Sequence, residues 1–294
     1  MAATGLSRTT LNDLSRVTES LQMLAPSWSV WVLMTLAARP LRYTEVRSKL
    51  ALLADGQLHP RLAKLVDAGL VERTEHAARN VTYGLTRRGT DLMTVLPVLA
   101  AWGDTHLEKP LVRSTTTGEL QPRPVAVAQN IEDTIALISP RHSTPLVWAL
   151  KARGPASAKA LAAEVMPAYS LSRVYPPLRR VVDDGLAETT PAGNYRLTAS
   201  GRALAPVYQA LSAWAGGHTV TEATTHPVWG QTLTPPSSAR SGPWLTTQSR
   251  LPVPPASPSP VRPGTTARWQ PGDLFSHPIP ARPPAVIPAG GPRR

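Results

Sequence analysis

The chain repeats part of itself, and this repeat limits the folds open to it more than any other feature. Residues 83–102 read YGLTRRGTDLMTVLPVLAAW and residues 195–214 read YRLTASGRALAPVYQALSAW, so nine of twenty positions are identical at an offset of 112. Two shorter blocks upstream recur in the same order: 66–73 with 182–189, and 33–40 with 147–155. The repeat therefore predicts two domains of one fold.

Both copies predict the same succession of elements. An apolar helix, a short helix and a third helix come first, and the third ends at Gly69 or Gly185, where the backbone needs positive φ. A β-hairpin follows, and Thr86 or Thr198 is the expected N-cap of a long closing helix. This is the winged-helix order. The predicted fold class is mainly α with small β-wings: two tandem winged helix-turn-helix domains plus a disordered C-terminal tail.

The domain boundaries follow from the repeat and from a change in composition. Domain one is expected at 7–108, a linker at 109–129, domain two at 130–220 and the tail at 221–294. Residues 222–294 hold seventeen prolines in 73 residues with no helix or strand period, a composition typical of disorder. The tail is either passive or an electrostatic tether or docking strip.

Each closing helix carries an apolar stripe at helical spacing that is long for one small domain to bury. We expect the stripe to form an interface between the copies or between chains, the alternative being that it packs on its own core. Its residues are Leu92, Val95, Leu96, Leu99 and Trp102 in copy one, and Leu204, Val207, Tyr208, Leu211 and Trp214 in copy two.

Composition excludes several classes of protein. The formal net charge of +12 favours an anionic partner such as nucleic acid, although a membrane surface would also satisfy it. Cysteine is absent, which excludes disulfides and thiol sensing. The N-terminus does not resemble a secretory signal, and no apolar run approaches the roughly 20 residues of a spanning helix. These features suit a cytoplasmic, nucleoid-associated protein without a membrane partner.

Enzyme chemistry has little support in the sequence. The seven histidines form no HExxH or other metal-ligand spacing, and GxGxxG, P-loop and GxSxG sequences are absent. We therefore expect no catalytic residue, no metal and no cofactor.

The run from Trp28 to Gly103 resembles the HxlR family of winged-helix regulators, with MarR and PadR as related families that stay open. The motifs are WSVWVLMTL, RYTEVRSKL, LxxRLxxLxxxGLVxR-like and YxLTxxGxxLxxVLxxLxxWG. The matching residues are Arg42, Tyr43, Glu45, Val46, Leu58, Arg61, Leu62, Leu65, Gly69, Leu70, Val71, Arg73, Tyr83, Leu85, Thr86, Gly89, Leu92, Val95, Leu96, Leu99, Trp102 and Gly103. The resemblance implies dimers that place the third helix in the major groove of double-stranded DNA. It also implies that the terminal helices form the dimer, so two copies in one chain could form a pseudo-dimer.

The chain departs from the family pattern at the start of the third helix. Ala54 stands where relatives have a serine cap, and Pro60 is matched by Pro176 and Pro177 in copy two. Because proline belongs in the first turn of a helix, we expect the helix to begin at the proline, after an extended His59 or Tyr175. A late start shortens the helix that would read DNA.

Basic and amide side chains near the third helix and the wing are the candidate DNA contacts. In copy one these are Gln57, His59, Arg61 and Lys64 on the helix, and Arg73, His76, Arg79, Arg87 and Arg88 around the wing. In copy two they are Ser172, Arg173, Arg179 and Arg180. Any one of them could instead be a solvated charge without a ligand.

The sequence thus predicts a DNA-binding transcription regulator in which domain one is the main reader. Domain two is a pseudo-dimer partner or weaker reader, because its wing carries no basic residue between positions 189 and 194. The alternative is a tandem winged-helix adaptor for protein partners, without sequence-specific DNA binding. A further homodimer and a small-molecule effector are both compatible with the sequence.

Overall fold

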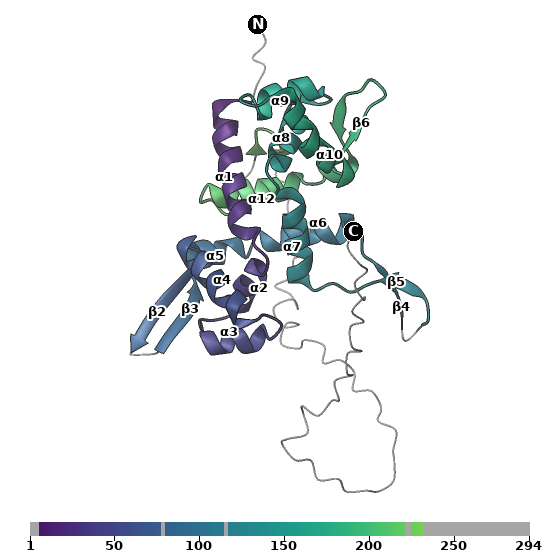
Figure 1. Ribbon diagram of the computed structural model, residues 1–294. Helices are drawn as coiled ribbons and strands as arrows, with labels where there is room; N and C mark the ends of the chain where they lie inside the picture. The colour runs from purple at the N-terminus through teal and green to yellow at the C-terminus, as the bar shows by residue number, and fades with distance from the viewer. Residues whose placement is uncertain (1–5, 78–79, 115–116, 221–224, 232–294) are drawn as a thin grey trace, which may run out of the picture. The chain divides into compact units, whose positions relative to one another are not determined.

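The computed structural model describes residues 6–77, 80–114, 117–220 and 225–231. It is mainly helical with short antiparallel sheets, as predicted (Figure 1). All described residues lie in one compact unit, Met1–Ser249. The expectation of a disordered tail falls on residues outside the described ones, except at 225–231.

The first half of the chain runs from α1 to α6. Its elements are α1 (Arg8–Leu24), α2 (Ser29–Leu36), β1 (Leu41–Arg42), α3 (Tyr43–Lys49), α4 (Asp55–Asp67), β2 (Val71–Ala77), β3 (Asn80–Leu85), α5 (Arg87–Leu92) and α6 (Leu96–His106). The strands form an antiparallel sheet in the order β1-β3-β2, with Tyr83 of β3 between Leu41 and Arg73.

The second half runs from α7 to the last described residue. Its elements are α7 (Val127–Ile138), α8 (Ser143–Arg153), α9 (Ala158–Val165), the 3-10 turn η1 (Leu171–Val174), α10 (Tyr175–Asp183), β6 (Ala187–Thr189), β7 (Tyr195–Leu197), α11 (Ala199–Arg202), α12 (Ala205–Ala215), β8 (Thr225–His226) and β9 (Gly230–Gln231). A single bridge between Ala156 and Tyr195 takes the place that β1 has in the first half.

The turn from hairpin to closing helix is built identically in both halves. The Thr86 hydroxyl accepts from the Gly89 N–H at 3.1 Å and donates to the Gly69 carbonyl at 2.7 Å. Thr198 caps α11 in the same way, so both predicted N-caps are confirmed. Gly69 and Gly185 have φ of 68° and 70°, as their place at a helix end requires.

Each closing helix is broken, where the sequence predicted one continuous helix. The cause is a proline at the second position of the second segment, Pro97 in α6 and Pro206 in α12. Proline has no N–H to donate to the carbonyl four residues before it, so the preceding helix ends and a new helix begins there. The apolar stripe nevertheless stays buried, since none of its ten residues is more than 6% exposed.

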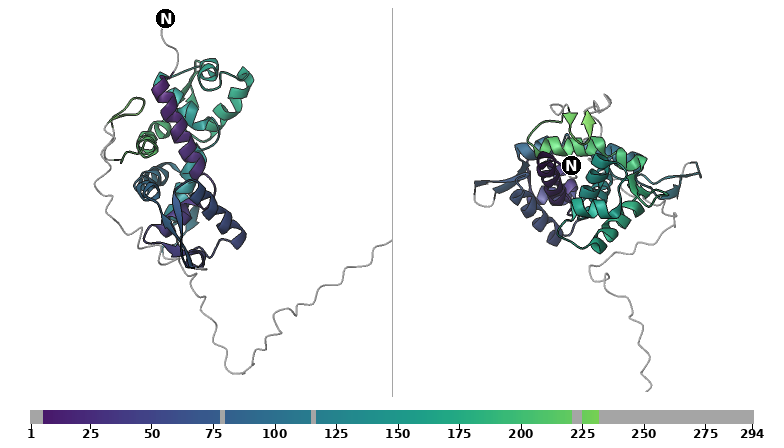
Figure 2. Two further views of the ribbon diagram at one scale, coloured as in Figure 1. Left: turned by 90° about the vertical axis from the view of Figure 1, so that its left-hand side faces the viewer. Right: turned by 90° about the horizontal axis from the view of Figure 1, so that it is seen from above.

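The two halves pack reciprocally through their first and last helices. Helix α1 lies against α12, and α7 lies against α6 (Figures 1 and 2). The Trp102 indole N–H donates to the carbonyl of Ser200 at 3.3 Å, and the Trp214 indole N–H donates to the carbonyl of Arg88 at 3.0 Å. The two bonds are equivalent in the repeat, because Trp102 corresponds to Trp214 and Arg88 corresponds to Ser200 at the offset of 112.

Two segments have more structure than the sequence indicated. The expected linker contains an antiparallel hairpin of β4 (Leu111–Arg113) and β5 (Leu120–Pro122), and α7 begins at its end. The hairpin of β8 and β9 lies where the tail was expected to have begun, and Trp229 within it is only 4% exposed.

Side chains from distant parts of the chain hold the β8–β9 hairpin in place. His226 donates to Asp13 of α1 at 2.8 Å from Nε2, because its Nδ1 accepts the N–H groups of residues 228 and 229. Gln209 of α12 donates to the carbonyls of Trp229 and Gly230, both at 3.1 Å. The prediction of a disordered tail is therefore wrong for residues 225–231, which lie beside α12 in Figure 2.

Candidate nucleic-acid interface

Helix α4 follows α3 in a helix-turn-helix arrangement and buries one side in the domain. Leu58, Leu62 and Leu65 are buried at helical spacing and fix which side of the helix packs against the domain. The predicted contacts Gln57, His59 and Lys64 are all exposed. A helix held this way can offer amide, imidazole and ammonium groups to a groove of DNA.

The start of α4 differs from the prediction. The helix begins at Asp55 rather than at Pro60, its N-cap Ala54 provides no side-chain hydrogen bond, and Pro60 lies inside the helix. Proline there has no N–H for the carbonyl of Gly56, which costs helix stability. The helix is tolerated because three leucines bury its inner face. The reading helix is accordingly longer than expected, and His59 is helical.

In the second half, Pro176 and Pro177 lie at the start of a helix rather than inside it. Helix α10 begins at Tyr175, whose φ and ψ of −64° and −44° are helical rather than extended as predicted. Pro176 and Pro177 then fall in the first turn, where no helical hydrogen bond is lost. The turn η1 precedes this helix and takes the place of the first turn of α4.

Arg61 is on the inner side of α4, contrary to its expected role on the reading face. It is half-buried, and among the described residues its Nε has no hydrogen-bond partner. Burial lowers the pKa of Arg61, and the nearby carboxylate of Glu132 opposes this shift only in part. The reason is visible in the spacing, because residue 61 lies three after Leu58 and four before Leu65.

Two of the predicted wing contacts have partners within the wing. Arg73 is paired with Glu75 at 2.6 Å, and His76 contacts the Thr82 hydroxyl at 3.0 Å. Arg79 lies outside the described residues. Arg87 is exposed at the start of α5. The guanidinium of Arg88 lies 5.0 Å from the ring centroid of Trp214, so this residue contacts the second half.

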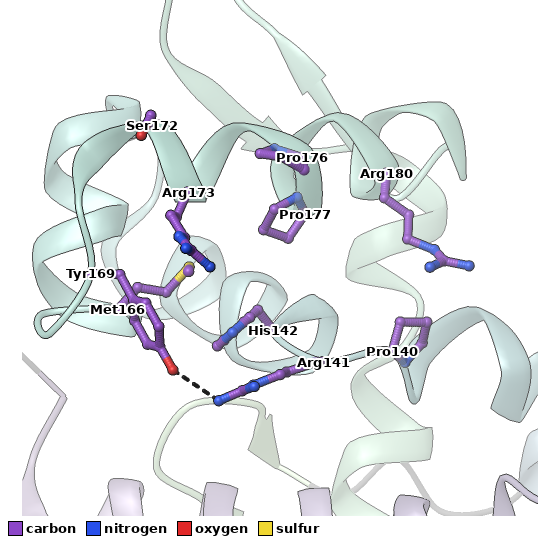
Figure 3. Close-up of a pocket in the computed structure, with 10 residues that line it drawn as sticks. All are labelled: Pro140, Arg141, His142, Met166, Tyr169, Ser172, Arg173, Pro176, Pro177 and Arg180. Carbon is purple, nitrogen blue, oxygen red and sulfur yellow. Dashed lines mark hydrogen bonds between the residues drawn. The ribbon is translucent and has the colours of Figure 1, made fainter.

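The candidate residues of the second half do not form one reading face. Arg179 is exposed on α10 and lies 3.7 Å from Asp183, with 84% of its side chain accessible. Ser172, Arg173 and Arg180 line a surface pocket together with Arg141, and Figure 3 shows the Arg180 guanidinium on the opposite side of it from those of Arg141 and Arg173. The only basic residue on the two wing strands, Arg196, is paired with Glu188 at 2.7 Å.

Helix α3 offers basic residues that the sequence reasoning did not select. Arg42, Arg47 and Lys49 are exposed on or directly before this helix. The first helix of a helix-turn-helix pair crosses the DNA backbone, where cations contact phosphates. Their position in that helix was readable from the sequence, since the RYTEVRSKL motif contains all three.

The fold and the exposed face of α4 define the class: a helix-turn-helix domain with a wing, the architecture of DNA-binding transcription regulators. More narrowly, residues 23–110 match the family described as HxlR-like helix-turn-helix, so this part of the chain is an HxlR-like domain, of a family of regulators. The matched segment spans α2 to α6. No curated protein matches the chain.

Neither a membrane-spanning helix nor a metal-binding cluster occurs in the described part of the chain. No helix there combines the length and apolar character that crossing a bilayer requires. No group of three or more His, Asp or Glu side chains in these residues is placed to hold a metal ion.

Proposed function

We propose that the chain is a DNA-binding transcription regulator whose first half is the main reader. The match of residues 23–110 to the HxlR-like domain carries this proposal. The exposed side of α4 supports it, since Gln57 and Lys64, seven residues apart and so on the same side of the helix, are both solvent-accessible, and His59 is exposed as well. Exposed cations on α3 add sites for phosphates, which supply affinity without sequence information.

We further propose that the second half completes a pseudo-dimer within the chain. A two-fold interface uses the same residues from both partners, so that each contact occurs twice. The paired bonds of Trp102 and Trp214 to the carbonyls of Ser200 and Arg88 have this form. So does the packing of α1 on α12 and of α7 on α6. On this proposal the chain is two tandem winged-helix domains.

A salt titration of duplex binding tests the role of α4. Binding of the full chain to a short duplex is followed by fluorescence anisotropy at several salt concentrations. Because each neutralised phosphate releases counterions, Lys64→Ala is expected to reduce the slope of log K against log salt by about 1. Arg123→Ala, at an exposed arginine directly after β5 and outside both helix-turn-helix units, is the matched control and should leave the slope unchanged. Equal slopes in both variants would contradict the assignment of α4.

The second candidate is a tandem winged-helix adaptor that binds protein rather than DNA. The pairing of Arg73 with Glu75 favours it, because the wing then offers less free positive charge to phosphates. The same titration separates the two functions. Failure of the full chain to bind duplex at low salt would favour the adaptor.

A further inference from the structure

A carboxylate of the second half reaches into the first half beside its reading helix. Glu132 lies on α7, and its Oε1 accepts the N–H of Val30 in the first turn of α2 at 3.1 Å. The N–H of Trp28 also hydrogen-bonds to this carboxylate, whose charge acts on Arg61 of α4. Because α2 packs against both α3 and α4, Glu132 connects α7 to the helix-turn-helix of the other half.

Helix α7 is itself fixed to the first half. The buried side chain of Asn130 donates from Nδ2 to the carbonyl of Ala100 and to the carboxylate of Asp104, both at 3.0 Å. At Gly103 of α6, an added Cβ would lie 2.5 Å from the hydroxyl oxygen of Thr134, so the two helices approach closely. Glu132 is therefore presented to α2 and α4 by a helix that is held in place on both sides of it along the sequence.

The carboxylate of Glu132 and the guanidinium of Arg61 both lie where burial disfavours their charge. Burial raises the pKa of Glu132, which the N–H groups of α2 and the charge of Arg61 oppose only in part, while the neighbouring charge of Asp133 adds to the rise. Burial also lowers the pKa of Arg61, and its buried Nε has no hydrogen-bond partner among the described residues. Each charge thus compensates the other, and removal of one leaves its partner uncompensated.

The second half lacks both members of this pair at the equivalent places. The first helices of the two halves align at an offset of 114, since the residues before α2 and α8 have the same φ of 73°. Glu132 then corresponds to Thr18, whose hydroxyl donates to a carbonyl within α1 at 2.7 Å. The third helices align at an offset of 116, as their terminal glycines at 69 and 185 show, and Arg61 corresponds to Pro177. The anion and the cation therefore occur together, in the half that carries the proposed reading helix.

We propose that Glu132 is a positioning residue for the reading helix, through which the second half fixes the start of α2 and compensates the charge of Arg61 on the inner side of α4. The inference rests on the proposed role of α4 in reading DNA. Glu132 acts through α2 and Arg61 and does not contact DNA. A displacement of α7 accordingly changes how α4 is held, which gives the second half control over the reader.

Hydrogen exchange of the full chain, followed by mass spectrometry, tests this link without DNA. Glu132→Gln keeps the shape of the side chain and an acceptor for the N–H of Val30, but removes the charge opposite Arg61. Amides of α4 are expected to exchange severalfold faster than in the wild type, whereas those of α10, the equivalent helix, should not change. Asp133→Asn is the matched control, because this carboxylate is exposed on the same helix, and it should leave α4 unchanged.

Binding to a short duplex separates positioning from contact with DNA. Glu132→Gln is expected to weaken binding about three- to tenfold at every salt concentration, with an unchanged slope of log K against log salt, because no phosphate contact is lost. In the double variant Glu132→Gln/Arg61→Met, the affinity should return toward that of the wild type, since the uncompensated guanidinium is then absent as well. A general weakening of the fold would not be rescued by this second substitution.

Four results would overturn the proposal. They are unchanged exchange of α4 in Glu132→Gln, an equal effect of Asp133→Asn, no rescue in the double variant, and a lower salt slope in Arg61→Met alone. The last would make Arg61 a phosphate contact rather than the partner of Glu132. Failure of the proposed function has a different signature: no protein binds duplex, although Glu132→Gln still accelerates exchange in α4.

Discussion

Gly89 and Gly201 determine how closely each closing helix approaches the loop before its hairpin. A Cβ at Gly89 would lie 2.1 Å from the carbonyl oxygen of Leu70, and one at Gly201 would lie 2.0 Å from that of Leu186. A backbone carbonyl cannot move out of the way of an added Cβ as the end of a flexible side chain can. This contact explains why glycine occupies the same position in both halves.

Gly89→Ala is therefore expected to lower the free energy of unfolding by about 3 kcal/mol or more, from overpacking against backbone. Urea denaturation of the full chain measures it. Gly56→Ala is the control, since a Cβ there meets nothing within 4 Å and alanine favours the helix, giving a gain of about 0.5 kcal/mol. A similar loss in both variants would contradict the steric explanation.

Asp13 connects α1 to the β8–β9 hairpin through a buried polar cluster. Burial alone would raise the pKa of Asp13, but the hydrogen bonds from His226 and Ser212 outweigh it, so the pKa lies below its ordinary 3.8. A carboxylate of this kind stabilises the fold above its unfolded pKa. The stabilisation is lost as pH falls through the folded pKa.

Asp13→Asn is expected to destabilise the chain at pH 7 by about 1 to 3 kcal/mol, because buried partners lose a charged acceptor. Below the folded pKa of Asp13, which is itself lower than 3.8, the difference from the wild type should shrink, since the wild-type carboxylate takes up a proton there. Thermal melts at both pH values provide the measurement, with exposed Asp67→Asn as control. A difference that is independent of pH would exclude the carboxylate as its source.

At the scale of elements, α4 combines a buried leucine face with a proline in its interior. Pro60→Ala restores an N–H that can donate to the carbonyl of Gly56, and is expected to stabilise the chain by about 1 to 3 kcal/mol. Pro176→Ala is the comparison, because that proline is in the first turn of α10 and its replacement should change stability little. Melting temperatures of both variants decide whether Pro60 is strained.

The elements whose signals are local could be predicted from the sequence. The N-caps at Thr86 and Thr198 and the positive φ of Gly69 and Gly185 depend on neighbours within a few residues, and all have the expected conformation. The β8–β9 hairpin could not be predicted, because His226 meets Asp13 across 213 positions of sequence. The early start of α4 was missed since buried leucines outweigh the cost of its proline.

For the candidate site, the sequence predicted the types of residue better than it predicted which side chains face the solvent. Gln57 and Lys64 are exposed on α4, whereas Arg61 turns inward toward Glu132, a residue 71 positions later. The pairing of Arg73 with Glu75 was also overlooked, although alternate residues on a strand share one face. The surface pocket could not be predicted from the sequence, because its three arginines come from separate segments of the chain.

At the scale of the whole molecule, the terminal helices of each half are covered by the other half. The full chain is therefore expected to sediment as a monomer of 31.5 kDa, since the surface that would join two chains is already occupied. Analytical ultracentrifugation over a range of micromolar concentrations checks this. A concentration-dependent dimer would show that a further apolar surface is available.

The reciprocal tryptophan bonds give a second prediction at this scale. Trp102→Phe and Trp214→Phe each remove an indole N–H and leave a backbone carbonyl without its donor, with an expected loss of about 1 kcal/mol apiece. Urea denaturation of the two single variants and the double variant measures the losses. If the two contacts are equivalent, the single losses match; a loss in only one variant would contradict the reciprocity.

Joining both halves in one polypeptide also has a genetic consequence. A regulator assembled from separate identical chains mixes mutant and normal subunits, so a defective allele can disable the normal product. Here α12 covers α1 and α6 contacts α7 within the same molecule, so these helices do not join separate subunits. Each half can also acquire substitutions alone, as Glu132 of α7 and its counterpart Thr18 of α1, at an offset of 114, illustrate. Defective alleles of this chain should accordingly be recessive.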